Sequence, residues 1–325
     1  MKIWKNAGLA AIIATALALP ARAEDVINAV HFTPTQVGFA QSFLRFVDKV
    51  NAAGEGVVRI DVRGGPEVIP NTQLGAAQQS GLIDMINNPA GLYLEIVPEG
   101  DAFSASKITP WEARENGGWD AIDKIYQEKG NAKLIAWVDT GVGFHIWTKD
   151  EPKVLDNGML DFNGLVLRAS PLYKQFFDSI GAQAVVMPMG DTYTALERGM
   201  INGLAYPSIG YKAFGWDKFT RYRVDPSFFG MDVLISMNLD AWNDLSDESK
   251  AVLETAAKEF EHESSDAMRK EDQETRALME SEGMKVVEMT GEGREAFLDA
   301  AAKSSWDRMN ERDPTHVEEL RALFD

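Results

Sequence analysis

The sequence contains no cysteine, which excludes disulfide bonds, cysteine nucleophiles and thiolate metal sites. Positive charge is also scarce: 32 lysine and arginine residues stand against 50 aspartate and glutamate residues, for a formal net charge of −18. Such a surface repels nucleic acid phosphates and anionic lipid headgroups, so neither nucleic acid nor a membrane surface is expected as a partner. If the ligand is an anion, local positive charge must hold it against the field of the whole protein.

Long apolar runs are absent except at the N-terminus. Lys2 and Lys5 precede an apolar run at residues 8–19, and residues 21–23 read Ala-Arg-Ala. This pattern is typical of a secretory signal peptide, so residues 1–23 are predicted to be removed on export, with no stable membrane insertion. An uncleaved anchor is the alternative, but the run is shorter than the roughly 20 residues that a spanning helix needs.

Catalytic motifs are not found either. The sequence has no HExxH pair, no GxSxG and no phosphate-loop glycine pattern. Carboxylates are plentiful, but nothing localises an acid pair, and a metal site built from His31 or His145 with aspartates is only a minor alternative. We therefore expect no enzyme, no catalytic residue, no metal and no cofactor.

Apolar patterning predicts alternating strands and helices after the N-terminal segment. The predicted elements are strands at 26–31, 57–62 and 82–86 with helices at 36–51 and 73–80 between them. Residues 110–129 are predicted to be helical with an interruption at Gly117 and Gly118, and residues 133–139 to form a further strand. This order favours a doubly wound α/β sheet over a barrel or a sandwich.

Two glycines, Gly141 and Gly143, precede a second series of elements. This series comprises strands at 144–148, 165–167, 184–187 and 203–206 and helices at 171–180 and 192–198. Asp191 is predicted to cap the second of these helices. The apolar residues 231–237 are predicted to form a strand that returns to a sheet. A chain that leaves one sheet at glycines and enters a new series indicates two lobes joined by crossing linkers.

An unusually long helical pattern runs from Ser246 to about residue 282 and would span roughly 50 Å. It is long enough to bridge both lobes. The alternative is two helices with a break near residues 261–265, although no proline or glycine lies there. A strand at 284–289 and helices at 291–312 and 315–324 are predicted to complete the chain.

Arg168 follows the apolar run at residues 165–167 and therefore lies where a buried strand ends. In open α/β sheets this end is where ligands bind, and the planar fork of a guanidinium suits a carboxylate or a phosphate. A structural salt bridge to one of the many acidic side chains is equally compatible with the spacing.

A series of linked motifs around Arg168 resembles a known family, the extracytoplasmic solute-binding proteins of tripartite ATP-independent periplasmic (TRAP) transporters, also called DctP-type or family 7. The motifs are GLVLR at 164–168, FDSIGA at 177–182, MP at 187–188, DTYTALERG at 191–199 and NG at 202–203. Weaker matches are NTQLG at 71–75 and LDAWNDL at 239–245. Several linked motifs in the same order are more specific than one short motif.

The resemblance implies a two-lobed periplasmic binding protein fold of the α/β class, with crossing strands and a long helix spanning both lobes. We expect residues 24–142 with 234–273 to form one lobe and residues 143–233 with 274–325 the other. The family mostly captures organic acid anions in the cleft, closes over them and passes them to membrane subunits. The resemblance thus implies a periplasmic transport receptor for a carboxylate.

By the same resemblance, Arg168 corresponds to the arginine that usually pairs with the ligand carboxylate. His145 and Tyr206 occupy positions where the sialic-acid branch has a ligand-contacting arginine and asparagine, so that branch's ligand is in doubt here. His145 is expected either to donate a hydrogen bond to the ligand or to be a packed strand residue. Tyr206 is expected to offer its hydroxyl or to fill the cleft wall.

Further ligand-binding candidates lie near expected strand ends and loops. They are His31, Phe32, Asn88, Met189 and Trp216. Asparagines at such a position are equally good turn residues, and most aromatic residues belong to the core. If several aromatic residues face the cleft, we expect a hydrophobic or aromatic acid rather than a hydroxylated sugar acid.

Two other functions remain compatible with the composition. A binding protein for an ABC importer or a sensor kinase has the same charge and size, and a secreted hydrolase is a more distant alternative. The linked motifs and the long helix favour the TRAP type.

Overall fold

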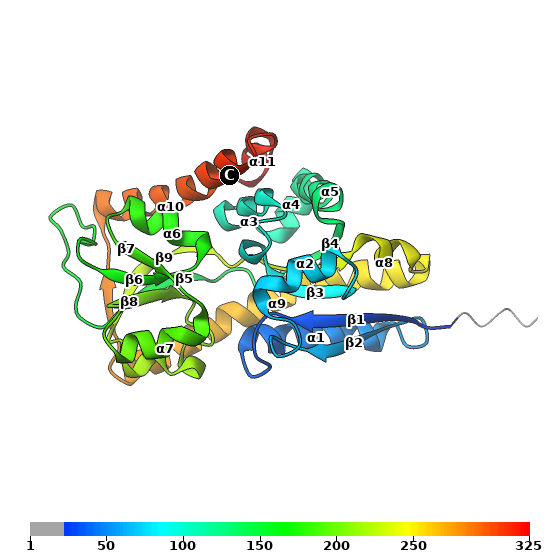
Figure 1. Ribbon diagram of the computed structural model, residues 1–325, viewed down its shortest axis with the longest axis horizontal. Coiled ribbons are helices and arrows are strands. Elements are labelled where there is room, and N and C mark those ends of the chain that lie inside the picture. Colours follow the sequence, from blue (N-terminus) through cyan, green and yellow to red (C-terminus); the bar gives the residue numbers. More distant parts are fainter. Residues whose placement is uncertain (1–22) are drawn as a thin grey trace, which may run out of the picture.

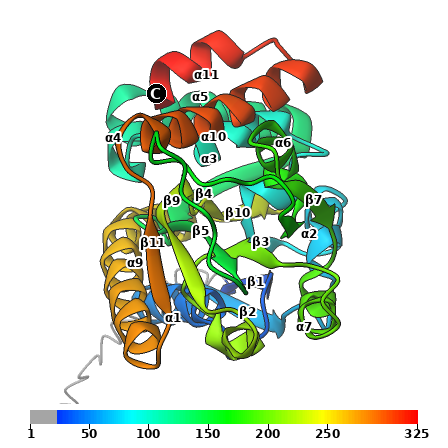
Figure 2. The ribbon, with the colours of Figure 1, turned by 90° about the vertical axis from the view of Figure 1, so that its left-hand side faces the viewer.

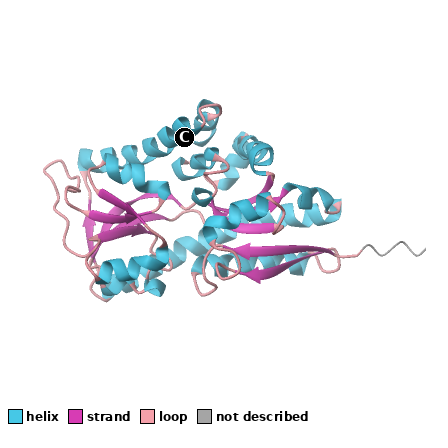
Figure 3. Ribbon diagram, viewed as in Figure 1, coloured by secondary structure: helices cyan, strands magenta, loops and turns pink. Residues whose placement is uncertain are grey.

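The computed structural model describes residues 23–325, and the expected signal peptide at residues 1–23 lies almost entirely outside them. Two β-sheets lie side by side, each with its own helices, which we call the first and the second lobe (Figure 1). The first lobe holds a five-stranded sheet of order β2-β1-β3-β10-β4, and the second a six-stranded sheet of order β11-β9-β5-β8-β6-β7. The predicted two-lobed α/β class is confirmed (Figure 3).

The first sheet begins with three parallel strands. They are β1 (Asp25–His31), β2 (Val58–Gly64) and β3 (Met85–Pro89), separated by α1 (Gly38–Ala53) and α2 (Leu74–Gln79). The predicted strand at 82–86 begins three residues too early, because Gly81 adopts a positive φ and Leu82 is turned into solvent. Asp84 then accepts hydrogen bonds from Asn28 and fixes the entry to β3.

Two antiparallel partners complete this sheet. β10 (Val233–Asn238) lies between β3 and β4 (Ala132–Val138), although it follows the whole second series in the chain. The helices between β3 and β4 are α3 (Asp101–Ala105), α4 (Pro110–Asn116) and α5 (Gly118–Gly130). Gly117, with a φ of 87°, separates α4 from α5 at the predicted interruption.

The second sheet contains one strand that the sequence did not predict. Its members are β5 (Gly143–Thr148), β6 (Val166–Ala169), β7 (Gln183–Val186), β8 (Gly203–Tyr206), β9 (Tyr222–Gly230) and β11 (Lys285–Glu288). β9 carries Pro226, yet it lies between β5 and β11. The register shifts between Phe144 and Ile146, opposite Pro226, and such an irregularity tolerates a residue without an amide hydrogen.

The helices of the second lobe are α6 (Pro171–Ser179) and α7 (Met189–Glu197). α7 begins three residues earlier than predicted, with Pro188 at the N-cap position, so Asp191 lies within the first turn and does not cap it. Pro188 has no side-chain acceptor, so α7 begins without a side-chain cap, and Asp191 places a negative charge in its first turn instead.

The C-terminal third is mainly helical. It comprises α8 (Leu239–Asp244), α9 (Asp247–Ser281), α10 (Gly291–Arg312) and α11 (Val317–Phe324). α9 is one continuous helix of 35 residues that runs past both sheets, so the alternative with a break near 261–265 is wrong (Figures 1 and 2). None of the helices in residues 23–325 is both long and apolar enough to cross a membrane.

Polar residues interrupt the apolar stripe of α9, and they form hydrogen bonds with the first lobe. Glu261 accepts two hydrogen bonds from Arg114 and one from the backbone amide of Trp137. Ser264 accepts from the amide of Asp139, where the chain leaves β4 for the second sheet. α9 is thereby fixed to one of the two segments that connect the sheets.

Those connecting segments are residues 139–142 and 231–232. They contact each other, because the amide of Met231 donates to the carbonyl of Val142 at 2.9 Å. Asp139 and Gly141 both have positive φ values, of 58° and 83°. The two lobes therefore join through narrow segments, α9 and the C-terminal helices.

Candidate functional site

A cavity of about 340 Å³ lies between the lobes, at the edge where strands of both sheets end. Phe32 follows β1, Pro89 ends β3, Met187 follows β7 and Tyr206 ends β8. Ligand sites of open α/β sheets are found at this edge. The cavity is also at the lower end of the size range of small-molecule sites.

The walls of the cavity are mostly apolar and come from both lobes. The first lobe contributes Phe32, Phe39 and Leu92, the connecting segment at 231–232 contributes Met231, and the second lobe contributes Phe144, Leu172, Met187 and Met189. The rings of Phe32 and Phe39 are 5.9 Å apart, and those of Phe144 and Tyr173 are 5.6 Å apart. A ligand in this cavity would touch both lobes at once.

Arg168 provides the positive charge of the cavity. Its strand β6 lies between β7 and β8, and its side chain is 6% exposed. Nε and Nη2 donate to the carbonyl oxygen of Met187 at 3.2 and 3.1 Å. Nη1 donates to the hydroxyl of Tyr173 at 2.7 Å, and this hydroxyl donates to the carbonyl of Ala205 at 2.9 Å.

These hydrogen bonds leave part of the guanidinium unused. An arginine has five N–H groups, and the three hydrogen bonds leave one on each of Nη1 and Nη2. Within residues 23–325, no carboxylate lies within 4.0 Å of Arg168, so the structural salt bridge that the sequence left open is not formed there. Arg168 thus presents a buried charge and two parallel donors, which suit a carboxylate.

Tyr206 lies beside this charge. Its ring packs edge-on against Phe214 and Trp216, at centroid distances of 5.7 and 5.1 Å. Burial raises the pKa of the Tyr206 hydroxyl well above its usual range, and the nearby charge of Arg168 opposes only part of that shift. The hydroxyl therefore keeps its proton at neutral pH and can donate a hydrogen bond.

Asp232 is the one carboxylate among the described residues that line the cavity. It is fully buried, and Ser104 donates a hydrogen bond to its Oδ2 at 2.7 Å. Burial raises its pKa to about 6, so its charge is easily lost. Asp232 lies where the chain enters β10, and its oxygen Oδ1 has no hydrogen-bond donor within residues 23–325.

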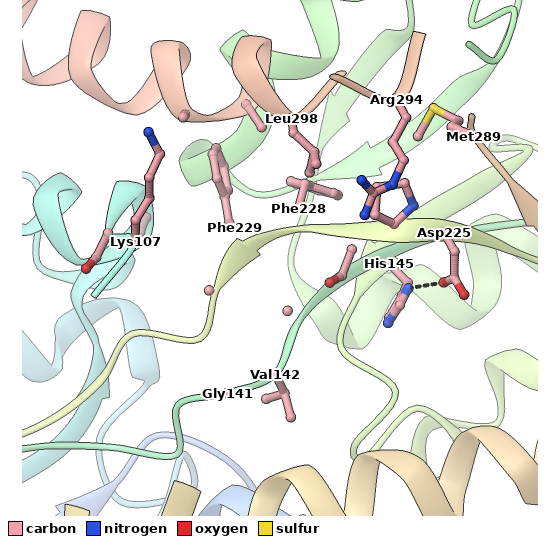
Figure 4. A pocket seen from close by; sticks show the side chains of 18 of the residues that line it. Lys107, Gly141, Val142, His145, Asp225, Phe228, Phe229, Met289, Arg294 and Leu298 are labelled. Atoms are coloured by element: carbon pink, nitrogen blue, oxygen red, sulfur yellow. Dashed lines mark ion pairs between the residues drawn. The ribbon is translucent and has the colours of Figure 1, made fainter. Parts of the chain in front are cut away.

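His145 faces a different hollow, of about 680 Å³, between β9, α9 and α10 (Figure 4). Its Nδ1 lies 2.8 Å from Oδ1 of Asp225. Burial of Asp225 acts to raise its pKa, but hydrogen bonds from His145 and Arg223 outweigh this and hold it well below its usual range. The structure thus places His145 in a hydrogen-bond network with Asp225 of β9 and outside the lining of the cavity at Arg168.

The other predicted residues divide between the cavity and its surroundings. Phe32 and Met189 line the cavity together with Arg168 and Tyr206. Trp216 is buried behind Tyr206, in contact with its ring. His31 and Asn88 are buried outside the lining: Nδ1 of His31 bonds the carbonyl of Thr33 at 2.7 Å, and the Asn88 amide has no partner within residues 23–325.

Most lining residues were not among the predicted ligand-binding residues. Tyr173 and Met187, which hold Arg168, and the carboxylate of Asp232 are the most important of them. The sequence gives a weak indication of Tyr173, which lies in the first turn of the helix that follows Arg168. Side chains of a helix tilt toward its N-terminus, so some of those in the first turn must lie near the end of the preceding strand. The sequence gives no such indication of the carbonyl of Met187 or the carboxylate of Asp232.

Nothing in the described chain suggests a metal centre. Within residues 23–325, no three histidine, aspartate or glutamate side chains are arranged to hold an ion. The cavity instead combines one buried cation, hydroxyl donors and apolar walls. This arrangement can bind a small anion with an apolar part, and it contains no histidine or lysine that could act as a base.

Comparison with known proteins gives a consistent picture. Residues 29–313 match the model of the family described as bacterial extracellular solute-binding protein, family 7 (DctP). A relative from Nostoc sp. (strain PCC 7120), a monocarboxylate 2-oxoacid-binding periplasmic protein, is 28% identical over 207 residues. That match covers 59% of this chain and 54% of the relative, so the chain matches about half the length of that protein.

Solved structures share the fold at low sequence identity. A TRAP periplasmic solute-binding protein from Desulfovibrio salexigens with bound orotic acid has a TM-score of 0.79 at 17% identity and covers 93% of this chain and 97% of its own. A Bordetella pertussis extracytoplasmic solute receptor that binds pyroglutamic acid has a TM-score of 0.78 at 16% identity, covering 92% and 99%.

Proposed function

The chain belongs to family 7 of the bacterial extracellular solute-binding proteins, and from this membership we propose that it is the periplasmic receptor of a TRAP transporter. In this role it captures an organic acid anion between its lobes and delivers it to the membrane subunits. Solved TRAP receptors of the same fold carry acids such as orotic acid.

The observation that carries the proposal is the state of Arg168. Arg168 is 6% exposed, has no carboxylate within 4.0 Å in residues 23–325 and keeps one free N–H on each terminal nitrogen. A buried charge of this kind costs free energy unless an anion pairs with it. A ligand carboxylate supplies that anion in a bidentate pair. Tyr206 adds a third donor beside it.

Closure of the lobes follows from the position of the cavity. Its walls come from both lobes, and the lobes connect through narrow segments at 139–142 and 231–232. A ligand that touches both walls stabilises the closed arrangement and excludes water from the charge pair, which strengthens it. The membrane subunits then distinguish loaded from empty receptor by the arrangement of the lobes.

We also propose which residues form each lobe. We assign residues 24–142 with 234–273 to the first lobe and residues 143–233 with 274–325 to the second. α10 contacts both α3 and α6, which lie in different lobes. Under this assignment the boundary between the lobes passes between α10 and α3, which the buried pair of Arg308 and Asp101 connects.

Transport measurements test the receptor role directly. Proteoliposomes that contain the cognate TRAP membrane subunits should take up a labelled carboxylate only when the receptor is added. Uptake that needs ATP and an ATP-hydrolysing subunit would instead assign the chain to an ABC importer. Turnover of the acid by the receptor alone would indicate a hydrolase or another enzyme.

A further inference from the structure

We propose that the ligand is a monocarboxylate with an apolar body, and that the site discriminates against dicarboxylates and sugar acids. This inference rests on the proposed function and adds the chemical class of the ligand. It follows from what lines the cavity beyond Arg168.

The cavity has a single cationic side chain in the part of its lining that the structure describes. Among the described residues that line the cavity, Arg168 is the only lysine, arginine or histidine. A second ligand carboxylate would therefore lose its water without gaining a cationic partner, and the remaining ionisable groups are the carboxylate of Asp232 and two tyrosines. An unpaired buried charge is strongly unfavourable, so a dicarboxylate is excluded on electrostatic grounds.

The walls of the cavity beyond Arg168 are mostly apolar. One wall consists of Phe32 and Leu92 of the first lobe with Met231 of the connecting segment, and the other wall consists of Phe144, Leu172 and Met189 of the second lobe. These side chains offer no hydrogen bond. Each hydroxyl of a sugar acid that met such a wall would lose a bond to water without a replacement, at a cost of about 1–3 kcal/mol.

Few other polar side chains line the cavity. Thr72 is exposed, Asn71 and Ser170 are half-buried, and Tyr206 lies next to Arg168. They can orient one polar substituent close to the carboxylate, such as an oxo or hydroxyl group. They cannot satisfy a chain of hydroxyls that extends toward Phe32 and Leu92.

The methionines of the walls favour some tolerance in the shape of the apolar body. Met187, Met189 and Met231 are unbranched, flexible and polarisable, so they adapt to aromatic as well as branched aliphatic groups. The site therefore selects its ligand by number of charges and by polarity more than by the shape of the apolar part.

Calorimetry with four probes tests the inference. We expect phenylacetate and 4-methylpentanoate to bind at least tenfold more tightly than succinate and glucuronate, and Arg168→Lys to weaken all measurable binding. Tighter binding of succinate or glucuronate would overturn this inference and leave the receptor role standing. If none of the four carboxylates bound, both this inference and the proposed function would be overturned.

Isosteric variants identify the wall responsible. Met189→Gln keeps the length of the side chain but adds an amide, and we expect at least a fivefold loss of phenylacetate affinity with no loss for glucuronate. Met200→Gln is the matched control, since Met200 is 63% exposed and lies outside the lining of the cavity. Equal phenylacetate affinities in these two variants would contradict the proposal.

A second pair of variants tests the other lobe. Leu92→Asn places an amide in the wall of the first lobe, and Leu323→Asn, at a half-buried leucine of α11, is its control. We expect only Leu92→Asn to reduce the preference for phenylacetate over glucuronate. An unchanged ratio in Leu92→Asn, with a melting temperature like that of the control, would contradict an apolar ligand body at this wall.

Discussion

The hydroxyl of Tyr173 lies 2.7 Å from Nη1 of Arg168 and 2.9 Å from the carbonyl oxygen of Ala205. It therefore links the guanidinium on β6 to the backbone of β8. Together with the carbonyl of Met187 after β7, it fixes the guanidinium of Arg168, which lines the cavity. The geometry of the proposed carboxylate anchor thus depends on residues from three adjacent strands and the helix α6.

Replacing Arg168 with lysine keeps the charge but removes the planar fork. We expect carboxylate affinity to fall by about tenfold or more, because a bidentate pair becomes a single contact. Isothermal titration calorimetry measures this loss, and Arg198→Lys, at an exposed arginine after α7, is the matched control. Unchanged affinity in Arg168→Lys would show that Arg168 does not bind the carboxylate.

Removing the hydroxyl in Tyr173→Phe takes away one of the anchors of Arg168. A typical hydrogen bond contributes about 0.5–1.5 kcal/mol, so we expect a roughly threefold to tenfold loss of affinity. Tyr93→Phe is the control, since its hydroxyl also donates to a buried carbonyl, that of Gly130, but lies outside the cavity lining. Both variants should lose similar stability in urea unfolding, and equal ligand affinities would contradict a positioning role for Tyr173.

A pH-dependent loss of stability is expected from Asp139. This residue is fully buried at the start of a connecting segment, and burial raises its pKa to about 7 despite a hydrogen bond from Ser42 and the nearby charge of Arg45. Glu271 of α9 also faces it and adds to the shift. Between about pH 4 and pH 7 the folded protein therefore binds a proton that the unfolded chain has released, so stability must fall as the pH rises through this window.

The variant Asp139→Asn should flatten this profile. Urea unfolding between pH 4.5 and pH 7.5 should show a decrease for the unmodified protein on the order of a few kcal/mol, to which Asp232, with a pKa raised to about 6, also contributes. The decrease should be clearly smaller in Asp139→Asn and unchanged in the control Asp48→Asn, at an exposed position of α1. Equal slopes in both variants would mean that Asp139 is ionised in the folded protein.

Arg308 of α10 joins both lobes, and its removal should be costly. Its guanidinium makes two hydrogen bonds, of 2.9 and 2.5 Å, with the buried carboxylate of Asp101 in α3, and a third with the carbonyl of Leu172 in α6. In Arg308→Met the Asp101 carboxylate stays buried without its partner, so we expect a loss of about 3–5 kcal/mol in the free energy of unfolding. The double variant Arg308→Met with Asp101→Asn should recover part of this loss, and a cost below about 1 kcal/mol for the single variant would be inconsistent with the pair.

The element order could largely be derived from the sequence because it depends on local patterns. Apolar alternation and glycine positions place most strands within one or two residues, and the absence of proline and glycine in 247–281 is enough for one continuous α9. β9 was missed because Pro226 and its neighbouring charges oppose a central strand, and only its partners β5 and β11 make it one. Local propensity gives way there to sheet pairing.

The sequence by itself determined that the chain has two α/β series and that Arg168 ends a strand, and its linked motifs pointed to the family to which the chain belongs. It could not decide which groups share the cavity with Arg168, because Tyr173, Met187 and Asp232 come from separate elements that only sheet order and lobe packing bring to one cavity. The same holds for His145, which adjoins Asp225 of the unpredicted β9. Contacts between elements distant along the chain depend on tertiary geometry. Such contacts hold Arg168 in the lining of the cavity, where a ligand can reach it.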